Sequence, residues 1–265
     1  MSHIILQADH LVKTYTQRAG RFGFGTRKVR ALDDVSLTLK QGTTLAIVGE
    51  SGSGKSTLAR CLLQLQSFEQ GEVLFQGENL AKMDAENLRK CRRDLQMVFQ
   101  DPFASLNPRM RIGEIVGEGL LIHALGDKQA QQEKVLRILH RVGLSEADIH
   151  KYPHQFSGGQ RQRISIARAL VLQPKIVVCD EPVSALDVSV QAQILLLLKE
   201  LQHEMQLSYI FITHDLRVVR HVADEMIVMQ HGKIVEHGTV DSVYNAPQQP
   251  YTQQLLSAIP GRKVA

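Results

Sequence analysis

The chain has 265 residues, 43% hydrophobic and 22% charged, a composition typical of a globular protein with a substantial core. Its 31 Lys and Arg exceed its 27 Asp and Glu, and the net charge of +4 suits an anionic ligand or a membrane surface without selecting either. The three cysteines are scattered and lack metal-ligand spacing, which indicates reduced thiols in a cytosolic compartment. No apolar run approaches the ~20 residues that cross a bilayer, and we expect no signal peptide.

Short β-rich runs alternate with longer helical patterns, which predicts a mostly parallel sheet with crossover helices. Residues 4–8 and 36–39 are expected to be early strands at an antiparallel edge. The apolar run 44–48 is expected to be a strand that leads directly into a glycine loop. Further strands are predicted at 96–99, 176–179 and 209–213, all of them central, and a hairpin at 226–229 and 234–235.

Between about residues 112 and 171 apolar side chains recur at helical spacing and β-branched runs vanish. Prolines stand at the edges of this region, where they interrupt regular structure. We therefore expect a mainly helical insertion within an α/β core.

Residues 16–30 form a Gly-rich stretch with five cations and no acid. Such a charge run is typical of a flexible, solvated loop. The alternative is a basic flap that lies near phosphates or anionic lipid headgroups.

The strongest motif follows the predicted strand 44–48 and matches G-x-x-x-x-G-K-[ST]. Its glycines allow backbone N–H groups to turn toward phosphates, and the helix that follows adds its positive end. We expect Lys55 to reach the β- and γ-phosphates of a nucleotide and the hydroxyl of Ser56 to bind Mg²⁺. The predicted phosphate-binding residues are Gly49, Ser51, Gly52, Ser53, Gly54, Lys55, Ser56 and Thr57.

Polar residues end three of the other predicted strands. Asp180 fits a contact to Mg²⁺, and Glu181 fits a base that orients the attacking water. His214 is predicted to sense the γ-phosphate, because open α/β sheets bind ligands at the carboxyl ends of their strands. Gln100 is suited to touch Mg²⁺ or its water. Together these residues indicate phosphoryl transfer to water.

A second glycine run, Phe156-Ser157-Gly158-Gly159-Gln160, enters a predicted helix and also suits a phosphate. In the order in which they occur, these motifs resemble the nucleotide-binding subunits of ABC transporters over essentially the whole chain. Phe156 is a mild departure, since Leu is commoner at the start of this signature.

The resemblance implies further site residues. Ser157, Gly158, Gly159 and Gln160 would grip the γ-phosphate of an ATP bound to another subunit. Ser184 and Asp187 would belong to the loop between the catalytic carboxylate and the next helix, called the D-loop. Tyr15 would stack on adenine, the alternative being an ordinary surface tyrosine.

The family fold implied is α/β, a P-loop NTPase core with a mostly parallel sheet, an antiparallel β subdomain and an inserted helical subdomain. We expect a single ABC nucleotide-binding domain over residues 1–265. Its expected parts are a RecA-like core with the β subdomain at 1–100 and 172–245, a helical subdomain at 101–171, and a short C-terminal tail at 246–265, without an added regulatory domain.

Residues 100–109 and 250–256 resemble the oligopeptide and dipeptide permease branch, which also includes nickel and metallophore importers. The implied function is an ATPase, with ATP and Mg²⁺ as cofactors, that energises an importer of di- or oligopeptides or similar small solutes. A nickel or metallophore importer is an alternative. A second alternative is a non-transport ABC ATPase that acts on nucleic acid. The sequence argues against it, because it shows no extended basic arm, no zinc insertion and no long coiled coil.

The implied partners are two transmembrane permease subunits, an extracytoplasmic solute-binding protein and a second nucleotide-binding subunit. We expect that second subunit to be a different chain, and we expect no nucleic acid. The resemblance places the protein peripherally on the cytoplasmic face of the bacterial plasma (inner) membrane. Residues 110–118 are expected to form part of the groove that docks the permease.

Overall fold

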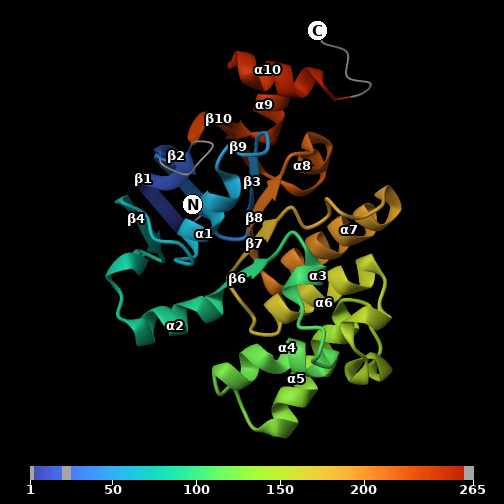
Figure 1. Ribbon diagram of the computed structural model, residues 1–265. Helices are drawn as coiled ribbons and strands as arrows, with labels where there is room; N and C mark the ends of the chain where they lie inside the picture. Colours follow the sequence, from blue (N-terminus) through green and yellow to red (C-terminus); the bar gives the residue numbers. More distant parts are fainter. Residues whose placement is uncertain (1–2, 20–24, 260–265) are drawn as a thin grey trace. The chain divides into compact units, whose positions relative to one another are not determined.

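The computed structural model describes residues 3–19 and 25–259 of the chain (Figure 1). It divides into two compact units. The first unit comprises Met1–Asp84 and Ile210–Ala265, and the second comprises Ala85–Tyr209. Within the described residues, no helix is both long and apolar enough to cross a membrane.

The first unit contains a four-stranded sheet in the order β2-β1-β4-β5. Its strands are β1 (Ile4–Ala19), β2 (Gly25–Lys40), β4 (Gln70–Phe75) and β5 (Glu78–Asn79). β1 pairs antiparallel with both β2 and β4. Leu6, Ala8 and Leu11 on β1 are fully buried, so one face of this sheet lies on the core. The sheet is the antiparallel part that the sequence predicted, although the strands are longer than expected.

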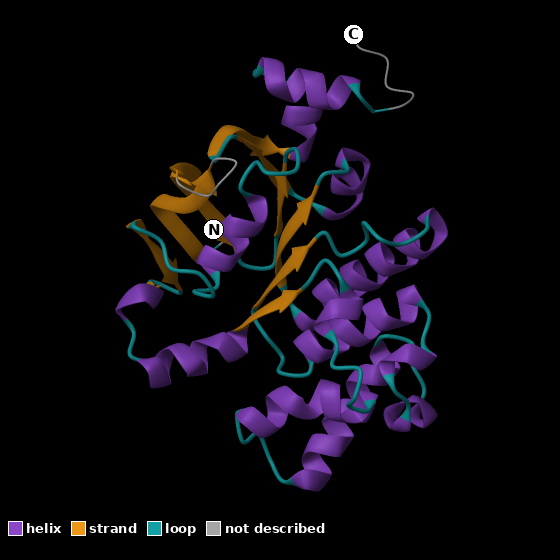
Figure 2. Ribbon diagram, viewed as in Figure 1, coloured by secondary structure: helices purple, strands orange, loops and turns teal. Residues whose placement is uncertain are grey.

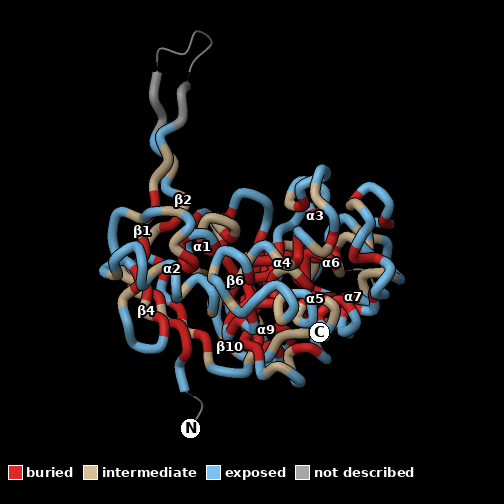
Figure 3. The backbone as a smooth tube through the Cα atoms, turned by 90° about the horizontal axis from the view of Figure 1, so that it is seen from below, coloured by how far each residue is buried: buried red, intermediate tan, exposed pale blue. Residues whose placement is uncertain are grey.

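Strands β1 and β2 extend through most of the stretch 16–30, where the sequence predicted a flexible loop (Figure 3). Thr16 pairs with Lys28, and Ala19 pairs with Gly25. The loop prediction is therefore wrong for the flanks of this stretch, while residues 20–24 lie outside the described residues. The physical reason is that a backbone ladder between two strands does not depend on the charge of their side chains.

The first unit also contributes strands to a second sheet, drawn in orange in Figure 2, in the order β10-β9-β3-β8. β3 (Thr44–Val48) is buried at every residue and pairs parallel with β9 (Glu225–Gln230). β9 and β10 (Lys233–Thr239) are antiparallel, which confirms the predicted hairpin. β8 spans Ser208–Thr213, as expected within one residue.

The helices of the first unit are short. They are α1 (Lys55–Leu62), the 3₁₀ turn η1 (Leu80–Lys82), α8 (Leu216–Val222), α9 (Val240–Asn245) and α10 (Pro250–Ser257). Residues of α8, α9 and α10 share one apolar cluster with Val48 of β3 and Val228 of β9. The C-terminal helices are therefore part of the core of this unit.

The second unit is built on two parallel strands, β6 (Leu95–Val98) and β7 (Ile176–Asp180). β6 ends the strand order of its sheet, so the prediction that it is central is wrong. Its apolar character has another cause, because helices α2 (Ala85–Asp94) and α6 (Gly158–Leu170) contact it. Burial by helices produces the same apolar run as burial between strands.

The remaining elements of the second unit are helical. They are α3 (Pro102–Ser105), α4 (Ile112–Ile122), α5 (Lys128–Arg141), the 3₁₀ turns η2 (Glu146–His150) and η3 (Pro153–Gln155), and α7 (Val188–Met205). No strand lies between β6 and β7 in this fully described part of the chain. The α/β fold with an all-helical stretch agrees with the predicted fold class, and the bounds 101–171 for a helical subdomain stay a prediction.

Candidate functional site

The predicted phosphate loop joins β3 to α1 in the first unit, and two of its glycines are required by close backbone contacts. Gly49 has φ 151° and Gly54 has φ 109°, in the region that favours glycine. A Cβ on Gly49 would lie 2.2 Å from the carbonyl oxygen of Met229, and one on Gly54 would lie 2.4 Å from that of Ala31. The loop is thus packed against backbone on two sides.

Lys55 is the first residue of α1 and is only 4% exposed. Its Nζ donates to the carbonyl oxygens of Gly49 and Glu50, each at 2.8 Å. The nearby Ser53 hydroxyl is buried and has no hydrogen-bond partner among the described residues. A buried ammonium beside an unsatisfied hydroxyl at the start of a helix fits an anionic group, because each polar atom gains a partner when that group binds.

The other predicted residues of the loop are accessible to a ligand. Ser51 and Gly52 are exposed, while Ser56 and Thr57, in the first turn of α1, are half-buried. Tyr15 lies on β1 and is half-buried, with the Lys13 ammonium 5.4 Å from its ring centroid. The contact with Lys13 does not test the adenine-stacking role of Tyr15, which stays a prediction.

His214 follows β8, the strand next to β3, and its side chain is exposed. The next residue, Asp215, caps α8 by accepting a hydrogen bond from the backbone of Arg217 at 2.9 Å. The guanidinium of Arg217 also bonds this carboxylate and is the main reason that the pKa of Asp215 is lowered. The cap fixes the backbone directly after His214.

In the second unit, three predicted residues lie at the ends of the parallel pair β6 and β7. Asp180 ends β7 and is 4% exposed. Glu181 follows with φ 47°, a left-handed conformation that is uncommon outside glycine. Gln100, just beyond β6, donates through Nε2 to Glu181 Oε2 at 3.1 Å. The structure therefore brings Gln100 and Glu181 together, as expected for the carboxyl ends of parallel strands.

The second glycine run begins α6. Ser157 is the N-cap, and its hydroxyl accepts from the backbone of Gln160 at 3.3 Å. In return, the Gln160 side chain accepts from the backbone N–H of Ser157 at 3.0 Å. This reciprocal capping box holds the helix start, while Ser157, Gly158 and Gln160 stay exposed. Phe156 is buried, so its position needs apolar bulk, which phenylalanine also supplies.

The predicted D-loop residues both make local hydrogen bonds. The Ser184 hydroxyl donates to the carbonyl oxygen of Glu181 at 3.1 Å. Asp187 caps α7, accepting from the Ser189 hydroxyl at 2.7 Å and from the backbone of Val190 at 3.1 Å. The Ser189 hydroxyl is the main cause of the lowered pKa of Asp187.

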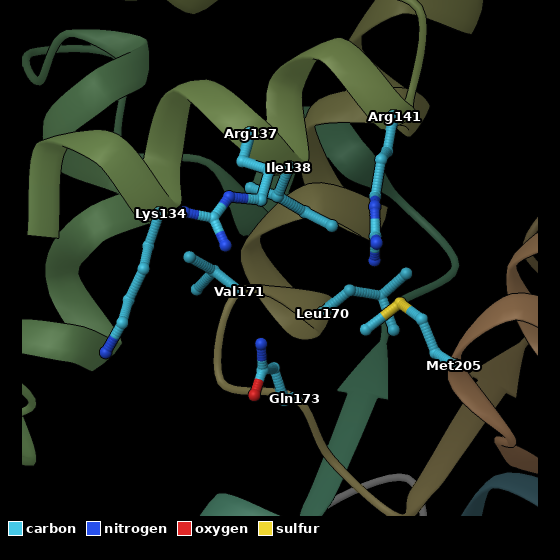
Figure 4. Close-up of a pocket in the computed structure, with 8 residues that line it drawn as sticks. All are labelled: Lys134, Arg137, Ile138, Arg141, Leu170, Val171, Gln173 and Met205. Carbon is cyan, nitrogen blue, oxygen red and sulfur yellow. The ribbon is translucent and has the colours of Figure 1, made fainter. Parts of the chain in front are cut away.

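Figure 4 shows a separate small cavity of about 30 Å³ in the second unit. The cations Lys134, Arg137 and Arg141 of α5 surround it, above the apolar side chains of Leu170 and Val171. None of the predicted nucleotide-binding residues lines this cavity.

Sequence reasoning missed one contact of the phosphate loop. The Tyr251 hydroxyl on α10 accepts a hydrogen bond from the backbone N–H of Glu50 at 3.1 Å. Residues 250–256 had only indicated a branch of a family, since no local spacing relates two residues so far apart in the sequence.

The family model described as "ABC transporter" matches residues 32–184. The dipeptide transport ATP-binding protein DppF of Escherichia coli (strain K12) is 52% identical over 256 residues, which is 97% of this chain and 76% of that protein. The oligopeptide transport ATP-binding protein OppF of Streptococcus mutans is 50% identical over 234 residues, 88% of this chain and 76% of that protein.

Solved structures give the same result. A dimeric ATP-binding cassette in a post-hydrolysis state, bound to ADP and Pi, matches with a TM-score of 0.77 and 32% identity, covering 89% of this chain and 98% of that one. cbiO1 from Clostridium perfringens, part of the ABC transporter complex cbiONQ, matches with a TM-score of 0.77 and 29% identity, covering 91% of this chain and 90% of that one. The chain belongs to the ABC transporter family.

Proposed function

We propose that this chain is the ATP-hydrolysing subunit of an ABC importer of dipeptides or oligopeptides. The observation that carries the proposal is the loop after β3, where the buried Lys55 and the unsatisfied Ser53 hydroxyl suit a phosphate group. The import of peptides is supported by the names of the relatives, which are dipeptide and oligopeptide transport ATP-binding proteins.

Four of the predicted residues then have these roles in hydrolysis. Lys55 binds the β- and γ-phosphates through its ammonium group, while the loop N–H groups surround them. Glu181 orients the attacking water, and Gln100, bonded to Glu181 at 3.1 Å, responds to nucleotide binding. His214 contacts the γ-phosphate.

Mg²⁺ prefers oxygen donors, and each residue assigned to it offers one: the Ser56 hydroxyl in the first unit, and the Gln100 amide and the Asp180 carboxylate in the second. When bound, it would neutralise charge on the phosphates. Asp180 is 4% exposed, and a carboxylate buried to this extent is stabilised by a cation or by hydrogen bonds.

Ser157, Gly158, Gly159 and Gln160 act on an ATP held by a second nucleotide-binding subunit. Ser157, Gly158 and Gln160 are exposed at the start of α6, a helix of 13 residues whose N-terminus attracts anions. We propose that the second subunit is a different chain and that Ser184 and Asp187 face it. ATP would then join the two subunits, and hydrolysis would release them.

We propose that the permease docks on the second unit at the cytoplasmic face of the inner membrane, with a solute-binding protein delivering the peptide from outside. A cavity of about 960 Å³ lies between α4, α5 and η2. Met110, Gly113 and Leu121 line it, and Leu121 is 71% exposed. The lining also carries charged side chains such as Glu114 and Lys128. A cavity of this size that combines apolar and charged side chains suits one short amphipathic helix of a permease subunit.

The test is binding of a fluorescent ATP analogue to the purified chain. Lys55→Ala is expected to weaken binding at least tenfold, roughly the value of one charge-assisted contact. Lys175→Ala is the matched control, since Lys175 is a surface lysine paired with Asp94 at 3.1 Å. Equal binding by the wild type and Lys55→Ala would contradict the phosphate-loop assignment.

A second arm of this test uses the assembled transporter in proteoliposomes. Glu181→Gln is expected to keep ATP binding and to lower dipeptide uptake at least about a hundredfold, since a positioned general base contributes about that much. Near-normal uptake by this variant would remove the role assigned to Glu181.

A further inference from the structure

The C-terminal helix α10 touches the phosphate loop within the first unit. Tyr251 accepts a hydrogen bond from the Glu50 N–H at 3.1 Å, across a separation of 201 residues. Glu50 is the second residue of the loop, directly after Gly49. A side chain from the far end of the chain thus contacts the backbone where the loop leaves β3.

The peptide group between Gly49 and Glu50 makes a hydrogen bond on each side, one to Tyr251 and one to Lys55. The peptide that links Gly49 to Glu50 donates its N–H to Tyr251 and accepts from Lys55 Nζ through the Gly49 carbonyl oxygen at 2.8 Å. Rotation of this peptide would break both hydrogen bonds at once. Donation from one side of a peptide also strengthens acceptance at the other.

The rest of the surroundings leaves this peptide little freedom. Gly49 lies so close to the Met229 carbonyl oxygen that even a Cβ does not fit. The start of α10 is anchored by the Glu236 carboxylate, which accepts from the backbone N–H groups of Gln248 at 2.7 Å and Gln249 at 3.2 Å. Leu256 of α10 is 1% exposed in the core cluster. Tyr251 is therefore carried by a fixed helix.

We propose that Tyr251 is a positioning residue for nucleotide binding: it fixes the Gly49–Glu50 peptide and thereby the place from which Lys55 reaches the phosphates. This inference rests on the proposed ATP-binding function of the loop. It assigns α10 a role in the nucleotide site, in addition to its packing in the core.

The experiment compares Tyr251→Phe with the wild-type chain in the binding of a fluorescent ADP analogue. Loss of one neutral hydrogen bond is expected to weaken binding about threefold to tenfold. Amide hydrogen exchange at Glu50 is expected to rise in the same variant, because its N–H then bonds only to water.

The matched control is Tyr209→Phe in the second unit. Tyr209 is buried, and its hydroxyl donates to the Leu198 carbonyl oxygen at 3.1 Å, so this variant also loses one tyrosine hydrogen bond. It is expected to bind the analogue like the wild type and to leave exchange at Glu50 unchanged. If Tyr209→Phe weakened binding as much as Tyr251→Phe, the effect would be general destabilisation and the inference would be overturned.

A second variant tests the anchor of α10. Glu236→Ala leaves the phosphate loop untouched but frees the start of the helix that carries Tyr251. It is expected to weaken binding in the same direction. The double variant, Tyr251→Phe with Glu236→Ala, is expected to bind the analogue within about twofold of Tyr251→Phe alone, since both changes act through one contact. Fully additive losses would contradict the proposed route.

The outcomes separate this inference from the proposed function. If neither the wild type nor Lys55→Ala bound the analogue, the proposed function would fail. If the wild type bound it, Lys55→Ala did not, and Tyr251→Phe matched the wild type, only the positioning role would be overturned.

Discussion

Among single residues, the adjacent glycines at the start of α6 differ in what surrounds them. A Cβ on Gly158 would meet Leu186 at 3.5 Å, an ordinary contact. A Cβ on Gly159 would lie 2.5 Å from a methyl carbon of Val190, whose β-branched side chain has few alternative rotamers. Gly159 therefore has a structural reason within this chain, while for Gly158 the structure gives none.

Gly159→Ala is expected to lower the free energy of unfolding by about 1–3 kcal/mol through overpacking. Gly158→Ala is expected to unfold at the same urea concentration as the wild type or slightly higher, since alanine favours a helix over glycine. Urea unfolding of the two variants checks it, and equal destabilisation of both would contradict it.

If Gly158→Ala folds normally and yet lowers turnover of the assembled transporter, the added methyl group obstructs the contact with the partner's ATP that is proposed for Gly158. Normal turnover in this variant would argue against the proposed contact at Gly158.

At the scale of elements, several helices begin directly beside predicted site residues. A side chain caps the starts of α6, α7 and α8, while α1 follows Gly54 without a side-chain cap. Asp215 caps α8 after His214, Ser157 caps α6, and Asp187 caps α7. A cap fixes the backbone where the helix leaves the site, so the same side chains stabilise the fold and orient the site.

The cap at Asp215 makes stability depend on pH. The pKa of this carboxyl is lowered in the folded chain, first by the hydrogen bond from the Arg217 side chain, from an ordinary value of 3.8. A lowered pKa means that the stabilisation is present above 3.8 and is lost as the pH falls through the folded value.

Asp215→Asn is therefore expected to be less stable than the wild type by about 0.5–1 kcal/mol at pH 7, because the ion pair is lost while the cap is kept. The difference is expected to shrink as the pH falls below 3.8. Urea unfolding across this range measures it, with Asp241→Asn on α9 as the control. A difference that stays constant with pH would show that the carboxylate charge is not the cause.

For the whole molecule, the surface proposed to dock the permease is the cavity of about 960 Å³ between α4, α5 and η2. Leu121→Glu replaces an exposed apolar side chain of its lining with a charge and is expected to prevent copurification with the membrane permease. Binding of the ATP analogue to the isolated chain should not change. Leu196→Glu is the control, because Leu196 is 60% exposed on α7 in the same unit and does not line the cavity. Equal loss of copurification in both variants would exclude the cavity as the specific dock.

Much of the architecture could be predicted from local patterns. β3, the β9–β10 hairpin and the helical stretch before β7 each follow from periodicity and turn residues within a few positions. The phosphate loop was predicted in the same way, since its glycines and Lys55 lie within one short segment of the chain. The lengths of β1 and β2 and the edge position of β6 could not be predicted, because they depend on pairing and packing with distant segments.

The sequence by itself therefore determined the family and the α/β class and predicted the phosphate loop, because the chemistry of each motif lies within one short segment. Only the tertiary structure decided that Tyr251 bonds the Glu50 backbone, that Glu181 takes a left-handed conformation beside Gln100, and that Gly159 but not Gly158 is sterically required. Each of these depends on atoms that folding brings together, and the spacing of residues along a chain does not record such contacts.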